Sequence, residues 1–266
     1  MTKKMKTLLV DGDVLLYEVV HQTLRVHEVG DGKYQTIGDA AEALSRFCGR
    51  VNDLKLSADC EDVVLCFSHH SPTFRHTQVD PDYKKKRSQE SVDRKRPIHF
   101  FPTEDRIKAW AEDAPGVSFV TEAGLEADDL IGLFATNGTP CVICTIDKDL
   151  QTIPGTHMHL RTQEKSVINE LQADAMFYTQ ALSGDTVDDI PGCKGIGKVR
   201  AERLVEKAIE DAEPGESPDF WSVVTATYEK AGMGEEDAIR NARLVRILRD
   251  GEYDWDSKEV KLWEPK

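Results

Sequence analysis

The 266-residue chain contains no long run of apolar residues, and this absence argues against a membrane-spanning helix. Its mean hydropathy is −0.46, and no apolar stretch approaches the roughly 18 residues that a membrane span requires. The apolar run behind the basic N-terminus covers only Thr7 to Val10, which is too short for the core of a signal peptide. We therefore expect no association with a membrane.

Cysteine is also scarce for a chain of this length. Six cysteines in 266 residues do not resemble the dense disulfide framework of small secreted domains. This usage predicts a protein of the reducing cytoplasm.

Basic residues are outnumbered, with 34 Lys and Arg against 48 Asp and Glu, and the formal net charge is −14. This balance argues against the broad basic surface that many nucleic-acid-binding proteins carry. The basic residues are concentrated, however: residues 84–96 have a net charge of +5 and residues 191–207 a net charge of +3. Two basic islands in an acidic chain can hold a polyanion locally.

Short apolar runs alternate with amphipathic helical patterns in the first 150 residues, which predicts an α/β fold with a mostly parallel sheet flanked by helices. The predicted core strands are Lys6–Val10, Asp62–Phe67, Val117–Thr121 and Cys141–Ile146. In such sheets ligands bind beyond the carboxyl ends of the strands. Asp11 stands at the end of the first run, and Asp147 and Asp149 follow the last.

Carboxylates gather at four places in the chain. Glu126, Asp128 and Asp129 begin a predicted helix, and we expect Asp185 and Asp188 to share one helical face. A sheet edge with this density of negative charge requires cations, and hard oxygen ligands suit Mg²⁺ or Mn²⁺. Two such ions about 4 Å apart can activate water and stabilise the leaving oxygen in phosphodiester cleavage.

A glycine-rich stretch follows the last acidic cluster and opens a basic helix. Gly192, Gly195 and Gly197 allow close approach of the backbone to a ligand, and Lys198 and Arg200 follow them. Amide groups at a helix N-terminus favour phosphate. We expect this stretch to bind a DNA backbone beside the metal site.

The basic run after residue 80 has two interpretations. It is either a solvated loop or a cationic segment that is mobile in the free protein and becomes ordered on DNA, because its like charges oppose a compact helix. In the second interpretation an aromatic ring stacks on a base and the cations contact phosphate. The expected DNA-contacting residues of this run are Tyr83, Lys84, Lys85, Lys86 and Arg87.

These motifs together resemble the 5′ nucleases of the flap-endonuclease family, and the chain is most similar to the 5′→3′ exonucleases of tailed phages. The resemblance rests on five stretches in family order, from Asp11 nearly to the end of the chain. They are Val10-Asp11-Gly12-Asp13, Asp82-Tyr83-Lys84 with Arg87, Glu126-Ala127-Asp128-Asp129, Thr145-Ile146-Asp147-Lys148-Asp149, and Gly184-Asp185 through Gly197.

The resemblance implies a PIN/FEN-like nuclease core, a helical arch and a helix-three-turn-helix motif. It implies a catalytic core over residues 1–180, with the basic arch at about 80–100, and a DNA-binding region over 181–266. Catalytic roles are implied for Lys84, Arg87, Asp11, Asp128 and Asp147, with Lys84 and Arg87 on the scissile phosphate. Metal-ligand roles, some through water, are implied for Asp11, Glu126, Asp128, Asp129, Asp147, Asp149, Asp185 and Asp188.

The implied activity is metal-dependent 5′→3′ exonuclease or flap-endonuclease hydrolysis, serving phage DNA replication, primer removal or recombination. The cofactors would be two Mg²⁺ or Mn²⁺ ions, with K⁺ at the Gly192–Lys198 loop. The partners would be double-stranded or 5′-flap DNA and the RNA of RNA–DNA hybrids, bound by a monomer in the cytoplasm of the host.

One position departs from the family pattern. Family members often carry Asp directly after the second strand, where this chain has Ser68. Either the second metal site is weaker, or Asp13 supplies the missing carboxylate. Asp13 has a second interpretation, as the cap of the first helix. Two rival functions remain: a non-catalytic DNA-junction binder, and a haloacid-dehalogenase-like phosphatase, whose Asp-x-Asp motif Asp11 and Asp13 would match.

Overall fold

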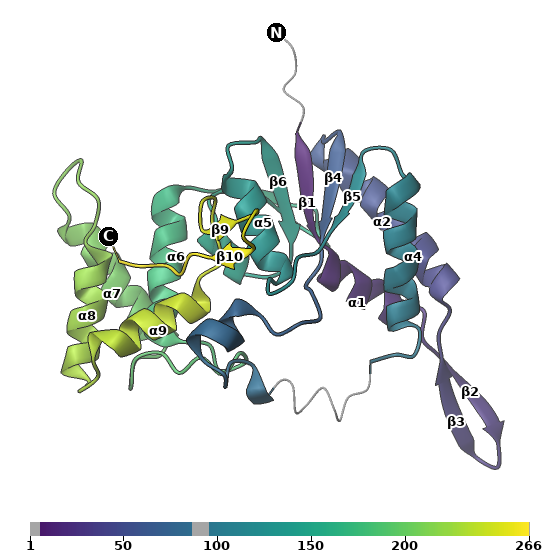
Figure 1. Cartoon of the computed structure of the whole chain (residues 1–266), viewed down its shortest axis with the longest axis horizontal. Helices are drawn as coiled ribbons and strands as arrows, with labels where there is room; N and C mark the ends of the chain where they lie inside the picture. The colour runs from purple at the N-terminus through teal and green to yellow at the C-terminus, as the bar shows by residue number, and fades with distance from the viewer. Residues whose placement is uncertain (1–5, 87–95, 266) are drawn as a thin grey trace, which may run out of the picture.

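The computed structural model describes residues 6–86 and 96–265, and a six-stranded sheet lies at its centre (Figure 1). Five strands run parallel, and β8 pairs antiparallel with β7 at one edge. In spatial order the strands are β5 (Val117–Val120), β4 (Asp62–Cys66), β1 (Thr7–Asp11), β6 (Cys141–Thr145), β7 (Gly155–His159) and β8 (Lys165–Ile168). The predicted α/β class and mostly parallel sheet are confirmed.

Helix α1 (Gly12–Gln22) begins directly at the carboxyl end of the central strand β1. Asp11 caps it, because its Oδ1 accepts the N–H of Val14 at 3.1 Å. A Cβ on Gly12 would lie 2.4 Å from the ring of Phe67, so glycine lets the helix start this close to the end of β4. The interpretation of Asp13 as the helix cap is therefore wrong, since Asp11 has that role.

Helices cover both faces of the sheet (Figure 1). On one face α1, α2 (Ala40–Ala58) and α4 (Phe100–Asp113) bury a cluster that includes Leu8, Phe47 and Ile107. On the other face α5 (Ala127–Thr136) and the segment around Leu248 bury a second cluster. Within residues 6–86 and 96–265 we find no helix that has the length and apolarity to cross a bilayer.

A two-stranded hairpin extends away from the sheet beyond α1 (Figure 1). It consists of β2 (Arg25–Gly30) and β3 (Lys33–Ile37), which pair antiparallel. All of its residues are exposed, so it contributes little to the core.

Four helices pack together after the sheet: α6 (Glu170–Ser183), α7 (Lys198–Asp211), α8 (Phe220–Lys230) and α9 (Glu235–Val245). Their shared core includes Leu182, Val205, Val224 and Ala238. The predicted domain boundary at residue 180 falls inside α6, and the division stays a prediction. The short strand β10 (Glu259–Val260) pairs with β9 (Tyr253–Asp254) near the end of the chain.

The segment between α6 and α7 differs from the sequence-based expectation. Asp185 and Asp188 do not lie on a helix, because α6 ends at Ser183 and no helical residue follows before Lys198. Instead Asp185 and Ile190 exchange backbone hydrogen bonds of 2.9 and 2.7 Å and close a loop. Gly184, at φ +66°, ends α6, and a Cβ there would lie 2.2 Å from the carbonyl oxygen of Ile190.

Candidate metal centre and phosphate loop

Asp11 is the innermost carboxylate of the carboxyl edge of the sheet. It is 3% exposed, and its Oδ2 accepts the hydroxyl of Thr145, at the end of β6, at 2.9 Å. Burial and then the negative charge of Asp13 raise the pKa of Asp11 to about 7. A buried carboxylate with so few donors is ready to accept a cation.

Asp128 faces the same edge from the first turn of α5. Burial and then the charges of Asp11 and Asp147 raise its pKa well above its usual range. Asp11, Asp128 and Asp147 come from three separate segments and lie close enough to influence one another electrostatically. Their role as metal ligands stays a prediction.

Asp147 and Asp149 follow β6, but they do not continue the strand. The N–H of Asp147 bonds to Thr145 Oγ1 and that of Asp149 to Asp147 Oδ1, at 2.9 and 2.8 Å. Asp149 begins the short 3₁₀ helix η2 (Asp149–Thr152) and accepts Gln180 Nε2 at 2.6 Å. Burial, then Asp147, and then the loop carboxylates Asp185 and Asp188 raise the pKa of Asp149 to about 6.

Asp129 does not join this edge. Its carboxylate is fully buried and bonds to both terminal nitrogens of Arg75 at 2.8 Å. It also accepts the backbone N–H of Glu126 at 3.1 Å. The expectation that Asp129 binds metal is therefore corrected: its oxygens are used within the protein.

Lys84 places a positive charge among the carboxylates. Its Nζ lies 2.6 Å from Glu126 and 3.3 Å from Asp188. Arg75 Nη1 is also 3.2 Å from Glu126, and Arg75 and Lys84 outweigh burial and lower the pKa of Glu126 to about 2. The pKa of Glu126 is thus lowered, whereas burial raises the pKa of its neighbours Asp11 and Asp128.

Tyr83 is buried, which contradicts its expected role as an exposed stacking ring. It is 4% exposed, packs with Ile190 and Leu244, and donates its hydroxyl to Glu126 at 3.0 Å. Lys85 and Lys86 are exposed, as phosphate contacts require. Residues 83–86 have hydrogen-bond and ion-pair partners in the folded protein, and the mobility of the basic run stays a prediction. Arg87 lies outside the described residues.

Asp13 occupies the space beside Ser68. Its Oδ2 accepts the backbone N–H of Ser68 at 3.1 Å, and the hydroxyl of Ser68 accepts the N–H of Ala127 at 3.0 Å. A carboxylate therefore stands beyond the end of β4, although Ser68 occupies the position where family members often carry an acid. This position favours compensation by Asp13 over a missing ligand.

The chemistry of this donor set fits hard divalent cations, because carboxylate oxygens are the ligands that Mg²⁺ prefers. In the described part of the chain, however, no three His, Cys, Asp or Glu side chains meet closely enough to hold one ion. Lys84 instead bridges Glu126 and Asp188. The carboxylates thus have the chemistry and the position of metal ligands, and the ammonium group of Lys84 lies between two of them, Glu126 and Asp188.

The glycine-rich stretch divides into a buried and an exposed half. Gly192 is buried, its N–H donates to Asn241 Oδ1 at 2.9 Å, and a Cβ there would lie 2.4 Å from Gly184. Its amide is therefore unavailable to a phosphate, which corrects the expected contact. Gly195 and Gly197 are exposed.

Lys198 and Arg200 are exposed in the first turn of α7, and Gly197 is its N-cap. No side chain caps this helix, and two cations stand beside its first turn. This exposed half of the loop retains the features of a phosphate site.

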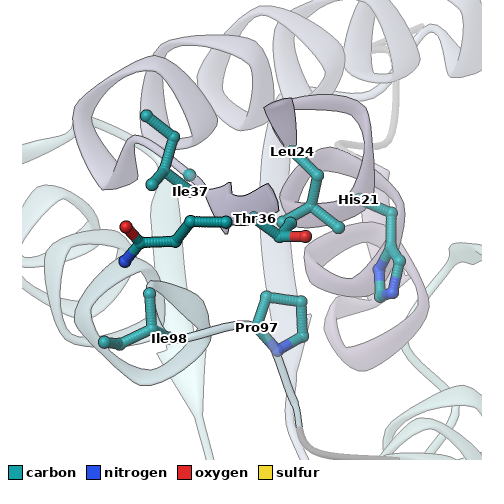
Figure 2. Close-up of a pocket in the computed structure, with 8 residues that line it drawn as sticks. His21, Leu24, Thr36, Ile37, Pro97 and Ile98 are labelled. Atoms are coloured by element: carbon teal, nitrogen blue, oxygen red, sulfur yellow. The ribbon is translucent and has the colours of Figure 1, made fainter. Parts of the chain in front are cut away.

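A separate cavity of about 540 Å³ lies at the base of the hairpin (Figure 2). His21 and Leu24 line it from the end of α1, Ile37 from β3, and Pro97 and Ile98 from the chain before α4. Its lining contains no carboxylate of the metal edge, so it belongs to neither site described above.

Sequence reasoning missed two residues that organise the site. Arg75, buried in the π-helical turn η1 (Arg75–Val79), binds Asp129 and Glu126 and the carbonyls of Leu244 and Arg246. Asp189 accepts the backbone N–H of Lys86 at 2.7 Å. Both partners lie far away in the chain, and no local pattern marks either contact.

Comparison with known proteins agrees with this geometry. The model of the 5′-3′ exonuclease, N-terminal resolvase-like domain, matches residues 6–179. The exonuclease of Escherichia phage T7 is 30% identical over 232 residues, which cover 76% of this chain and 74% of the T7 protein. The exodeoxyribonuclease of Enterobacteria phage T3 is 28% identical over 236 residues, with 77% and 74% covered.

Solved structures share the fold. The T5 5′-exonuclease with bound divalent zinc ions has a TM-score of 0.64 and 17% identity, covering 90% of this chain and 89% of that one. The T5 D15 protein co-crystallized with metal ions has a TM-score of 0.62 and 18% identity, with 90% and 88% covered. At this identity the likeness concerns the fold alone, and it agrees with the predicted nuclease-like core.

Proposed function

Because this chain belongs to the 5′-3′ exonuclease N-terminal resolvase-like domain family, we propose that it is a metal-dependent 5′→3′ exonuclease or flap endonuclease acting on DNA. The observation that supports this most strongly is the convergence of Asp11, Asp128 and Asp147 at one edge of the sheet, with Lys84 beside them. Phosphodiester hydrolysis needs such a combination of metal-binding carboxylates and a phosphate-binding cation.

We propose a ligand set without Asp129. Two Mg²⁺ or Mn²⁺ ions bound at this edge would supply an activated water and stabilise the leaving oxygen. The carboxylates that would hold them, directly or through water, are Asp11, Glu126, Asp128, Asp147, Asp149, Asp185 and Asp188, with Asp13 added beside Ser68. The hydroxyl of Thr145 and the N–H of Val14 orient Asp11 for this task.

Lys84 would hold the scissile phosphate, together with Arg87. Its ammonium group now neutralises Glu126 and Asp188, so it already lies where a negatively charged phosphate must approach. A cation at this point stabilises the charge that grows on the phosphate oxygens in the transition state.

The exposed half of the glycine-rich loop would bind the duplex backbone away from the scissile bond. Gly195, Gly197 and the first amides of α7 would face a phosphate, with Lys198 and Arg200 beside it and K⁺ as a further counter-ion. Contacts of this kind fix the position of DNA without reading its sequence. The duplex or 5′-flap DNA would then lie across α7 toward the carboxyl edge of the sheet.

Several finer properties complete the proposal. The substrate is double-stranded or 5′-flap DNA, including the RNA strand of RNA–DNA hybrids, and the enzyme acts as a monomer. Its setting is phage DNA replication, primer removal or recombination in the cytoplasm of a host cell. The similarity to the T7 and T3 enzymes supports this setting.

The test is a Mg²⁺ titration against 5′-labelled duplex and 5′-flap substrates of one sequence, with products separated by size. Cleavage that depends on Mg²⁺ or Mn²⁺ is expected, and the size ladder distinguishes single-nucleotide removal from release of an intact flap. Binding without cleavage at any metal concentration would instead identify a junction-binding protein. Release of phosphate alone, from a phosphomonoester, would identify a phosphatase.

A further inference from the structure

The start of the basic run lies against the loop between α6 and α7. We call residues 83–86 the arch foot and residues 184–190 the acidic loop. The backbone N–H of Lys84 donates to the carbonyl of Asp188 at 3.0 Å. The N–H of Lys86 donates to the Asp189 carboxylate at 2.7 Å, and Lys86 Nζ lies 2.6 Å from its other oxygen. Segments about 100 residues apart in the chain are thus joined by main-chain donors.

Both sides of this contact contain a left-handed residue. Lys84 has φ +54° and Asp189 has φ +59°, a region that side chains with a Cβ adopt at an energetic cost. Such conformations persist where surrounding contacts fix them. The contact therefore determines the direction in which the side chain of Lys84 points.

A small apolar cluster fixes the rest of the arch foot. Tyr83 packs with Ile190 of the acidic loop and Leu244 of α9, and its hydroxyl bonds to Glu126. Tyr83 anchors one end of the arch foot, and Asp189 holds the other. Between them the side chain of Lys84 reaches Glu126 and Asp188 at the metal edge.

We propose that Asp189 is a positioning residue that anchors the arch foot and thereby holds Lys84 at the catalytic edge. The inference rests on the proposed function, because it assigns Lys84 a part in phosphate chemistry. It also connects the two nucleic-acid contacts, since Asp189 lies six residues before Gly195 of the phosphate loop. DNA bound by that loop would therefore lie next to the short segment that positions Lys84.

The backbone bond, and not the ion pair, carries this role. The side chain of Lys86 is 74% exposed, and exposed ion pairs contribute little because water and salt screen them. Lys85 and Lys86 have helical backbone, and a side chain that accepts such a backbone N–H acts as a helix cap does. Asparagine at residue 189 would keep an acceptor and tolerate φ > 0, whereas glycine would tolerate φ > 0 and remove the acceptor.

The experiment compares Asp189→Gly and Asp189→Asn in the full-length protein. Three quantities are measured: the single-turnover cleavage rate in Mg²⁺, the dissociation constant for the same DNA in Ca²⁺, and hydrogen exchange of the Lys84 and Lys86 amides without DNA. Asp211→Asn is the matched control, because it removes one acid from an exposed pair with Lys207 at the far end of α7.

Asp189→Gly should lower the cleavage rate about tenfold, the size of effect that a lost cap bond permits, with the dissociation constant changed by less than about twofold. Exchange of the Lys86 amide should accelerate by a similar factor. Asp189→Asn should restore most of the rate and protection, and Asp211→Asn should match the parent in all three measurements.

Two results would overturn the inference. A parent-like rate in Asp189→Gly, with the amides deprotected, would show that the anchor does not position Lys84. Unchanged exchange in Asp189→Gly would show that the anchor itself is not formed through this side chain. Failure of the proposed function is distinguishable from both, since a parent protein that cleaves no DNA in Mg²⁺ would refute that function while the exchange measurement still tested the anchor.

Discussion

Arg75 and Asp129 form a buried, two-bond ion pair, with both nitrogen–oxygen distances at 2.8 Å. Arg75 is 3% exposed and Asp129 is fully buried. The same guanidinium donates to the carbonyls of Leu244 and Arg246. One side chain thus ties the first turn of α5 to the end of α9, and it connects the nuclease sheet with the C-terminal helices.

Breaking this pair should destabilise the protein severely. Asp129→Asn removes the fully buried counter-charge that binds both terminal nitrogens of Arg75, and breaking such a pair costs about 3–5 kcal/mol. Urea unfolding followed by circular dichroism measures the loss of unfolding free energy. Asp211→Asn, which disturbs only an exposed pair, should leave the free energy of unfolding nearly unchanged. A loss in Asp129→Asn as small as that of the control would contradict the structural role.

Removal of single carboxylates at the metal edge should abolish turnover and spare binding. Asp128→Asn and Asp147→Asn should each lower the cleavage rate by about 10²-fold or more, because each removes charge that would hold a catalytic ion. Gel-shift titration in Ca²⁺ should give nearly the parent affinity. Asp256→Asn, an exposed turn residue, is the control. Equal turnover by parent and variants at saturating Mg²⁺ would refute the ligand assignment.

Lys84 and its neighbour Lys85 should behave differently. Lys84 lies among the carboxylates, whereas Lys85 is exposed and pairs with Asp82 at 2.9 Å. Lys84→Ala should cut the single-turnover rate far more than it weakens binding, since a group at the scissile phosphate acts mainly in the transition state. Lys85→Ala should alter affinity without a comparable loss of rate. Equal effects of the two substitutions on the rate would contradict a special role for Lys84.

The phosphate loop should bind DNA through charge alone. Lys198→Ala should weaken binding equally for unrelated sequences and reduce the slope of log K against log salt by about one unit. Lys207→Ala, at the opposite end of α7 and paired with Asp211, serves as the control and should leave the slope unchanged. Fluorescence anisotropy over a salt series measures both slopes. A sequence-dependent loss would point to base contacts instead.

The metal-free protein should lose stability as the pH rises. Burial raises the pKa of Asp11 to about 7 and that of Asp149 to about 6, above the usual value of 3.8 for both. A raised pKa means that the folded state binds protons more tightly than the unfolded state. The contribution of these groups is therefore complete below about pH 4 and is lost as the pH rises through 6 and 7.

Thermal unfolding in EDTA between pH 5 and pH 8 measures this loss. Asp11→Asn should flatten the profile, and Mg²⁺ should raise the melting temperature more at pH 8 than at pH 5.5, because ionised carboxylates bind the ion better. Measurements above pH 5 avoid the acid unfolding of the protein that protonation of its other carboxylates causes. A profile that is flat in the parent, or identical in Asp11→Asn, would show that Asp11 is not the group responsible.

The sequence by itself determined the α/β class, four of the six strands in the described sheet and the acidic residues at the carboxyl ends of two of them. The reason is local: short apolar runs set buried strands, and Asp11 and Asp147 follow two of them. Parallel strands bring their carboxyl ends to one edge whatever the loops do. The basic start of α7 was equally readable from its charge and from the glycines before it.

Only the tertiary structure decided which carboxylates face the edge. The helical pattern of the sequence does not distinguish Glu126 from Asp129. In the structure the buried guanidinium of Arg75 pairs fully with Asp129 and only partly with Glu126. Asp185 and Asp188 look helical by spacing, but Gly184 and the bonds between Asp185 and Ile190 form a loop. Tyr83 and Asp189 were misjudged or missed because their partners lie about 40 to 110 residues away. Local pattern fixes which residues can carry charge to the site, whereas long-range packing fixes which charges remain available there.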